Sequence, residues 1–331
     1  MTELSPYRQF AEMMQHGDSK WIPEILKLMV DDEQARLLVS LPGTAREMAE
    51  KLDREPDAVD ADLKDLFRKG LAFKKEKEGN TLWRAPGRLI QFHDATLVWP
   101  EAPAELLDLW RDYMDEEYPS FAREMARRSP QRHTRVIPVG KSLDPGKVQV
   151  LAPENLKKLV ESARRFAVTD CTCRLSMRKC DSPVEVCLQV DRGADYAIER
   201  GTGRELTKTE AMGVIQASEE AGLVHVAMNK AELGYFICNC CGCCCLSFSL
   251  LTTAGLRRCE SSRYRPTIDD DLCTACGACQ DRCWFGAIAI GDEDVAVMNE
   301  EKCLGCGQCA VGCPEEAIVM VEVVGADFIP Q

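Results

Sequence analysis

The chain has 331 residues and a formal net charge of −13, and 29% of its residues are charged. This length is sufficient for two or three domains with separate cores. It contains no run of 18 or more apolar residues, which excludes a membrane-spanning helix, and its first residues lack the basic and then apolar blocks of a secretory signal. We therefore expect a cytoplasmic protein.

Cysteine is the most unusual part of the composition, with 19 residues. Cytoplasmic thiols are kept reduced, and an odd number fits a fully paired disulfide framework poorly. The cysteines therefore indicate metal binding.

Residues 1–130 are predicted to form a helical domain. The stretch 32–41 is amphipathic, a capping box opens a second helix at Thr44, and a third helix runs from Asp57 to Gly70. Residues 71–86 then predict a two-stranded hairpin. Three helices and a hairpin in this order resemble the winged helix-turn-helix fold, and the rest of the domain predicts further helices.

A winged helix that binds DNA places its third helix in the major groove. The exposed positions of that helix are mainly acidic, and phosphate binding requires the opposite charge. The acidic residues are Asp57, Asp60, Asp62 and Asp65. The sequence therefore favours a docking or homodimerisation role over nucleic-acid binding.

Residues 131–262 are predicted to form a cysteine-rich α/β domain. The expected elements are strands at 135–140 and 148–153, a helix at 153–167, a capped helix at 207–222 and a buried strand at 223–229. His225, in this last strand, is predicted to be a satisfied core histidine, and Cys259 is either a free thiol or a further ligand.

Four cysteines in this domain are the right number for one further [4Fe-4S] cluster, although no standard spacing matches: Cys171, Cys173, Cys180 and Cys187. Arg174, Arg178 and Lys179 would lower the pKa values of these thiols and offset the charge of an anionic cluster. The alternative is a set of scattered buried thiols.

The segment YFICNCCGCCCLSF, at 235–248, carries six more candidate ligands: Cys238, Cys240, Cys241, Cys243, Cys244 and Cys245. Neighbouring residues of an extended chain point to opposite sides, so the last three cannot all bind one ordinary cube. Either a tight turn at Gly242 gathers some of them, or different thiols bind different metals. Cluster ligation is the favoured interpretation, with sulfur transfer, a thiol redox pair or a zinc site as alternatives.

Three segments of the middle domain together resemble a family of uncharacterised iron–sulfur proteins of anaerobes. They are the C-x-C-R motif at 171–174, the GLVHVAMN stretch at 222–229 and the cysteine run. The resemblance implies an iron–sulfur protein with a C-terminal dicluster ferredoxin, and it names no reaction.

Residues 263–331 contain two copies of C-x2-C-x2-C-x3-C, each followed by an Ala-Ile pair. Three thiolates two residues apart can wrap one corner of a cube, and the fourth cysteine points across to the other cube. The pattern resembles the bacterial two-[4Fe-4S] ferredoxin domain. The resemblance implies cluster I on Cys273, Cys276, Cys279 and Cys313, and cluster II on Cys303, Cys306, Cys309 and Cys283. Trp284 replaces the proline that the family prefers after Cys283.

The negative charge is concentrated in the same segment. From Pro266 to Gln331 there are 13 Asp and Glu residues against two basic residues, a net charge of −11. Such a surface repels nucleic acid and suits a basic protein partner, although acidic residues also keep a small domain soluble.

The sequence thus predicts a multidomain α+β protein that transfers low-potential electrons between redox partners of anaerobic metabolism. Two or more [4Fe-4S] clusters would carry the electrons, and the partner would be a larger electron-transfer complex. The first alternative is a reductase that acts on a small substrate or cofactor at the middle domain. The second is a redox-sensing winged-helix transcription regulator.

Overall fold

The computed structural model describes residues 4–330 and mixes helices with strands, in agreement with the predicted α+β class. The chain divides into two compact units. The first contains the N-terminal 124 residues with two short later segments, and the second contains most of the remainder. None of the helices between residues 4 and 330 is both long and apolar enough to cross a membrane.

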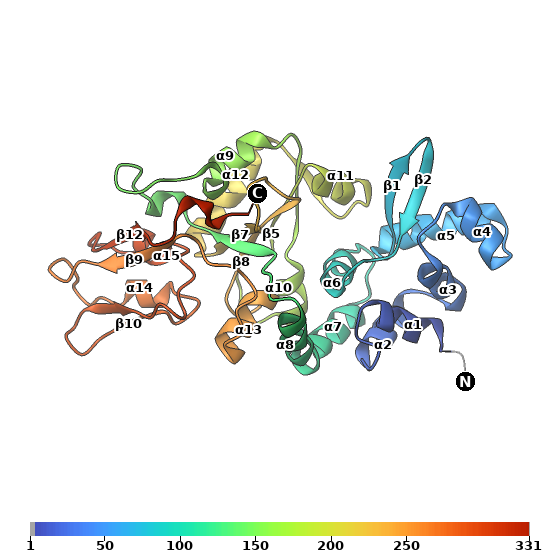
Figure 1. Ribbon diagram of the computed structural model, residues 1–331, viewed down its shortest axis with the longest axis horizontal. Helices are drawn as coiled ribbons and strands as arrows, with labels where there is room; N and C mark the ends of the chain where they lie inside the picture. The colour runs from blue at the N-terminus through green and yellow to red at the C-terminus, as the bar shows by residue number, and fades with distance from the viewer. Residues whose placement is uncertain (1–3, 331) are drawn as a thin grey trace. The chain divides into compact units, whose positions relative to one another are not determined.

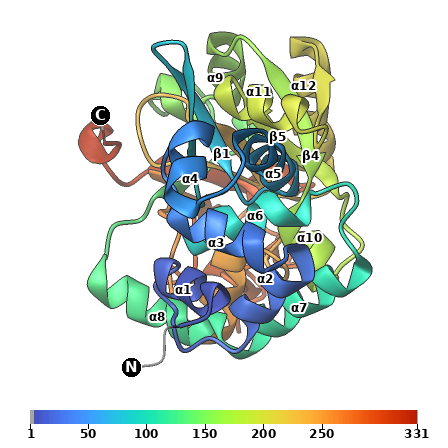
Figure 2. The ribbon, with the colours of Figure 1, turned by 90° about the vertical axis from the view of Figure 1, so that its right-hand side faces the viewer.

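The N-terminal unit is mainly helical (Figure 2). Its helices are α1 Pro6–Met13, α2 Trp21–Met29, α3 Asp32–Ser40, α4 Ala45–Leu52, α5 Pro56–Lys69, α6 Leu89–Leu97 and α7 Ala104–Glu116, and α8 Tyr118–Arg128 follows. The hairpin joins β1 Phe73–Lys77 to β2 Asn80–Arg84. The predicted order of three helices and a hairpin over residues 32–85 is confirmed, as is the capping box in which Thr44 accepts from the backbone of Glu47.

A stack of aromatic side chains fills the core of this unit. Phe92 contacts Phe10 and Trp110 edge to face, with ring centroids 5.0 and 4.9 Å apart, and Trp110 contacts Tyr113 in the same way. All four side chains are fully buried. Each such pair contributes about 0.5–1.5 kcal/mol beyond the burial of its area, so these rings hold α1, α6 and α7 together.

The second unit is built on a six-stranded antiparallel sheet with the order β3-β7-β8-β5-β4-β6 (Figure 1). The strands are β3 Thr134–Ile137, β4 Phe166–Asp170, β5 Glu185–Val190, β6 Arg204–Leu206, β7 Val224–Met228 and β8 Phe236–Cys240. The helices that accompany it are α9 Leu156–Ser162, α10 Thr172–Met177, α11 Arg192–Glu199, α12 Lys208–Glu220 and α13 Leu246–Ala254.

Two sequence expectations for this sheet are wrong. Residues 148–153 form no strand and lead instead into a short 3-10 helix, Ala152–Glu154. The helix expected at 153–167 is α9, which ends at Ser162. Phe166 and Val168 alternate into the core of the sheet, so burial of their side chains places the end of the expected helix in β4.

The two faces of the sheet are covered differently. On one face, α9 and α12 pack Leu159 and Ile215 against Leu188 and Ile237. On the other face, side chains of β7 and β8 share a core with Phe248 of α13 and with residues of the C-terminal segment, among them Phe285 and Leu304. The C-terminal cysteine repeats therefore form part of the packing of this sheet.

The C-terminal segment adds two small two-stranded sheets and two short helices. β9 Tyr264–Ile268 pairs with β12 Ile318–Glu322, and β10 Ile288–Ile290 pairs with β11 Ala296–Met298. The helices α14 Ala278–Asp281 and α15 Gln308–Val311 lie inside the two cysteine repeats.

A buried ion pair connects this segment to the middle of the chain. The fully buried Arg263 guanidinium donates to both carboxylate oxygens of Glu154, at 2.8 and 2.9 Å, and to Glu322 at 2.6 Å. The hydroxyl of Tyr264 donates to the same Glu154 carboxylate at 2.9 Å. Removing one partner would leave the other charge buried without compensation.

We therefore expect Glu154→Ala to destabilise the protein by about 3 kcal/mol or more, because Arg263 would remain buried after losing this carboxylate. Urea unfolding of the anaerobically prepared protein, followed by circular dichroism, measures the change. Glu161→Ala, at an exposed position of α9, is the control and should change stability by less than about 0.5 kcal/mol. Equal effects of the two substitutions would show that the ion pair contributes nothing particular.

Candidate metal centres

Two cavities in the C-terminal segment are each lined by four cysteines. The first, of about 310 Å³, is lined by Cys273, Cys276, Cys279 and Cys313. The second, of about 330 Å³, is lined by Cys283, Cys303, Cys306 and Cys309. Each cavity takes three cysteines from one repeat and one from the other, which is the grouping that the resemblance to ferredoxins implies.

The short helices produce this exchange of cysteines. α14 carries Cys279 at the first cavity and leads directly to Cys283 at the second, while α15 carries Cys309 at the second and leads to Cys313 at the first. Gly277 and Gly307 begin these helices with φ of 77° and 80°, a conformation that costs other residues energy.

The cavities also present hydrogen-bond donors to sulfur. The backbone N–H of Ala287 donates to Cys283 Sγ at 3.2 Å, that of Ala296 to Cys273 Sγ at 3.4 Å, and that of Gly305 to Cys303 Sγ at 3.4 Å. Donors of this kind stabilise the negative charge of thiolates and of the cluster they hold. Four thiols, a cavity and N–H donors fit a [4Fe-4S] cluster in both places.

The ten cysteines of residues 171–245 fall into two groups, which divide the set differently from the sequence hypothesis. The first, here called the six-thiol group, is a closed ring of thiols in hydrogen-bond contact. In order around the ring its members are Cys171, Cys173, Cys245, Cys240, Cys238 and Cys187. Cys180, which we expected to join Cys171, Cys173 and Cys187, lies in the other group.

Strand geometry explains the membership of the six-thiol group. Successive side chains of a strand point to opposite faces, so Cys238 and Cys240 share one face of β8 while Ile237 and Asn239 share the other. Leu188 of β5 pairs with Ile237, which puts the neighbouring Cys187 on the same face as Cys238. The starts of α10 and α13 supply the remaining three thiols.

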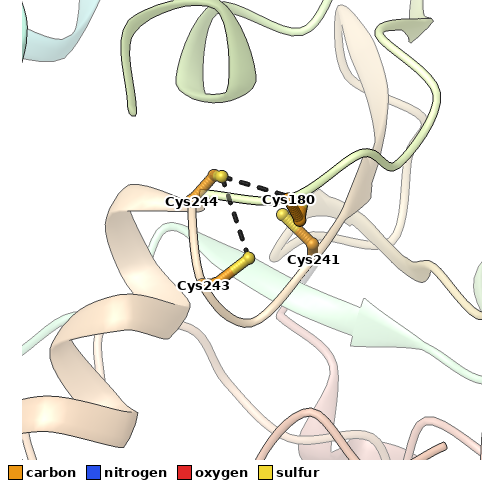
Figure 3. Close-up of side chains that lie close together, drawn as sticks. All are labelled: Cys180, Cys241, Cys243 and Cys244. Atoms are coloured by element: carbon orange, nitrogen blue, oxygen red, sulfur yellow. Dashed lines mark hydrogen bonds between the residues drawn. The ribbon is translucent and has the colours of Figure 1, made fainter. Parts of the chain in front are cut away.

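The second group, here called the four-thiol group, contains Cys180, Cys241, Cys243 and Cys244, whose sulfur atoms all lie within 4.8 Å of one another. Figure 3 shows that three of them come from one tight turn before α13, while Cys180 comes from a separate segment. The sulfur of Cys244 lies 3.9 Å from that of Cys180 and 3.8 Å from that of Cys243. The turn at Gly242 thus gathers three thiols, and Cys245 belongs to the other group.

Crowding and burial alter the acidity of these thiols. Hydrogen bonds from Cys173 and Cys187 lower the pKa of Cys171 to about 2, and a hydrogen bond from Cys244 lowers the pKa of Cys241 to about 4. Burial raises the pKa of Cys243 to about 12. One thiol in each group therefore ionises at the expense of its neighbours, and a bound cation would allow the others to ionise as well.

Arg174 is a buried cation beside both groups. Its Nη2 donates to the carbonyl of Asn239 at 2.9 Å, and within the described residues Nε and Nη1 have no hydrogen-bond partner. Burial would lower its pKa, but the negative charges of Cys171 and Cys241 raise it overall. The guanidinium thus remains protonated, and it offsets part of the charge that thiolates or an anionic cluster bring there.

His225 and Asn239 have structural roles on the opposite side of β7 and β8. They face each other in register, and His225 Nδ1 lies 2.6 Å from Asn239 Oδ1, while Asn239 Nδ2 donates to the carbonyl of Val186 at 2.6 Å. His225 is therefore a hydrogen-bonded core residue. The role of Asn239 was missed in the sequence, where its alternation with Cys238 and Cys240 was the available signal.

Direct contacts join the second cavity to the middle sheet. Trp284 Nε1 donates to the carbonyl of Gly222 at 2.8 Å, and Gln308 Nε2 donates to that of Leu223 at 2.7 Å. A Cβ on Gly242 would lie 2.7 Å from the backbone oxygen of Trp284, so the turn of the cysteine run packs tightly on this tryptophan. Trp284 thus has a packing role that proline could not fill.

Cys259 belongs to none of these cysteine sets. It is buried, its sulfur lies 3.6 Å from the carbonyl of Glu260, and burial raises its pKa to about 12. This environment describes a protonated core thiol, which makes the residue a useful control.

Comparison with known proteins agrees with the chemistry of the C-terminal segment. Residues 295–318 match the family of 4Fe-4S binding domains. An uncharacterized ferredoxin of Methanocaldococcus jannaschii is 31% identical over 100 residues, which are 29% of this chain and 57% of that protein. A ferredoxin of Pyrobaculum islandicum is 35% identical over 60 residues, which are 18% of this chain and 56% of that protein.

A third relative belongs to the Na(+)-translocating ferredoxin:NAD(+) oxidoreductase complex of Acetobacterium woodii, and one of the proteins of that complex is 37% identical over 49 residues, or 15% of each chain. The chain therefore spans between 15% and 57% of the length of these relatives. No solved structure matches. The chain carries a ferredoxin-type domain that binds 4Fe-4S clusters near its C-terminus.

Proposed function

We propose that the protein is an electron carrier with two ferredoxin clusters and a further centre in the middle domain. Cluster I would be held by the cysteines of the first cavity and cluster II by those of the second. The main support is that three cysteines of the second cavity, Cys283, Cys303 and Cys306, pack in the same apolar core as Cys238, Cys240 and Cys245 of the six-thiol group. The division into domains at 131–262 and 263–331 is part of this proposal.

The first cavity is the one that a redox partner can approach. Cys276 is the one exposed cysteine among the described residues, and the neighbouring Leu272 is 50% exposed. Asp269, Asp270 and Asp271 are also exposed and precede them directly. An apolar contact beside acidic side chains suits a basic protein that docks transiently.

The second cavity is turned towards the middle sheet. Arg282 and Gln308, which line it, donate to the carbonyls of Glu219 and Leu223 between α12 and β7. The chain thereby fixes the position of this cavity relative to the six-thiol group and excludes water between them with the side chains of Phe248 and Phe285.

When bound, iron–sulfur clusters supply one-electron transfer. The residues of the chain set the order of the centres: an exposed cysteine at the first cavity, buried cysteines at the second, and the six-thiol group on the sheet beyond. The relative from Acetobacterium woodii is part of an oxidoreductase complex, which supports a larger electron-transfer complex as the partner.

The N-terminal unit would then serve as a winged-helix-like docking domain. The acidic residues of α5 are paired with cations: Asp62 with Arg54 at 2.6 Å, Asp60 with Lys64 at 2.6 Å and Asp65 with Lys69 at 2.7 Å. Basic residues of α5 are thus engaged by carboxylates rather than presented to phosphates, which favours protein docking over DNA binding.

The exchange of cysteines between repeats can be tested with two double variants. Cys273→Ala/Cys313→Ala removes two ligands of one proposed cluster, so we expect a loss of about four irons and four sulfides per chain. Cys303→Ala/Cys313→Ala removes one ligand from each cluster, so about eight of each should be lost. Iron and acid-labile sulfide are measured on anaerobically purified protein.

Cys259→Ala is the control for these variants and should retain all iron and sulfide. The opposite order of losses, with Cys303→Ala/Cys313→Ala losing only one cluster, would mean that each repeat holds its own cluster and would refute the proposed ligand sets.

The docking surface predicts an electron-transfer rate that depends on salt. With a basic haem protein as acceptor, we expect the rate of its reduction by the reduced protein to fall severalfold between 0.1 and 1 M salt, as the Debye length shortens from about 10 to about 3 Å. Asp270→Lys/Asp271→Lys should slow the reaction at low salt and weaken this salt dependence. Stopped-flow absorbance of the acceptor gives both rates.

Glu33→Lys/Glu50→Lys changes the net charge equally at exposed positions of the N-terminal unit and is the matched control. If it slowed the reaction as much as the change at Asp270 and Asp271, net charge alone would explain the rate, and the proposed docking surface would be wrong.

A further inference from the structure

We propose that the four-thiol group binds a single metal ion, zinc or ferrous iron, on four thiolates. This site is separate from the two ferredoxin clusters and from the six-thiol group. It adds a mononuclear centre to a protein otherwise built around clusters, and it does not depend on the proposed electron-transfer function.

The spacing of the sulfur atoms matches one ion. A Zn–S bond is about 2.3 Å long, so a tetrahedron of thiolates around one zinc has S–S edges of about 3.8 Å. The distances from Cys244 to Cys180 and Cys243 are 3.9 and 3.8 Å, and no pair in the group exceeds 4.8 Å. A disulfide is excluded for these pairs, because its sulfur atoms lie about 2.05 Å apart.

The same spacing is too short for a cube. The four thiolates of a [4Fe-4S] cluster bind four different irons and project from separate corners, so they lie further apart than four thiolates on one ion. The ferredoxin cysteines illustrate the difference within this chain, because they line cavities of about 310 and 330 Å³. Over residues 4–330, no other set of three or more Cys, His, Asp or Glu ligands gathers as closely as the four-thiol group.

The surroundings suit a complex of negative charge. Four thiolates and a divalent ion carry a net charge of −2. The buried Arg174 guanidinium supplies positive charge beside Cys241, and the backbone N–H of Lys179 donates to Cys244 Sγ at 3.4 Å. A set of four sulfur ligands in this arrangement is typical of zinc or iron rather than of oxygen-preferring cations such as magnesium.

The position of the ion in the chain indicates what it does. Cys180 lies between Cys173 and Cys187, and Cys241, Cys243 and Cys244 lie between Cys240 and Cys245. The residues on both sides of the four-thiol group therefore belong to the six-thiol group. An ion that joins the Cys180 segment to the turn fixes both loops that present the six-thiol group.

The experiment compares metal content and metal environment in the anaerobically purified full chain. We expect one zinc or one iron per chain beyond the metal that accompanies sulfide. Cys243→Ser should lose about one equivalent of metal and no sulfide, whereas Cys243→His should retain the ion, because three thiolates and an imidazole also form a tetrahedral site. Cys259→Ser is the control and should keep both metal and sulfide.

X-ray absorption of the wild-type protein tests the site even if a variant fails to fold. For zinc, the expected spectrum shows four sulfur neighbours at about 2.3 Å and no neighbouring metal. For iron, Mössbauer spectroscopy should show a high-spin ferrous component outside the clusters. Loss of about four irons together with sulfide from Cys243→Ser, or the absence of any mononuclear component from the wild type, would overturn the proposal.

Discussion

The arrangement of the metal centres depends on one constraint, the two-residue period of β8. Because side chains alternate across a strand, Cys238 and Cys240 face the C-terminal segment, while Ile237 and Asn239 face the opposite side. A shift of one residue in the pairing of β7 and β8 would send the thiols to the wrong face and bury the amide of Asn239 away from His225. The hydrogen bond between these two side chains therefore helps to fix the register that the thiols require.

Charge is the second constraint. Thiolates repel one another, and burial in a sheet core makes each of them more costly. The chain answers this with cations and N–H groups placed at the thiols: Arg174 in the middle domain, and the backbone donors of Ala287, Ala296 and Gly305 in the C-terminal segment. The acidic side chains are kept on the exposed surface, where water solvates them.

Much of this organisation could be predicted from the sequence. Local signals predicted the helices and hairpin of residues 32–85, and the two cysteine repeats predicted a 4Fe-4S domain, because both depend on residues close together in the chain. The division of the middle cysteines could not be predicted in this way. It depends on which strands neighbour β8 and on the packing of Trp284 against Gly242, and both are contacts between distant parts of the sequence.

The tight alternation of the two thiol groups has a consequence for how the chain can change. Their boundaries fall at single peptide bonds, between Cys240 and Cys241 and between Cys244 and Cys245. Inserting or deleting one residue in this segment would move thiols from one group into the other, even with every cysteine kept. The hairpin turn at Gly79, where an added Cβ meets no atom within 4 Å, can vary in length at little cost. The segment 238–245 is instead a place where length itself is under constraint.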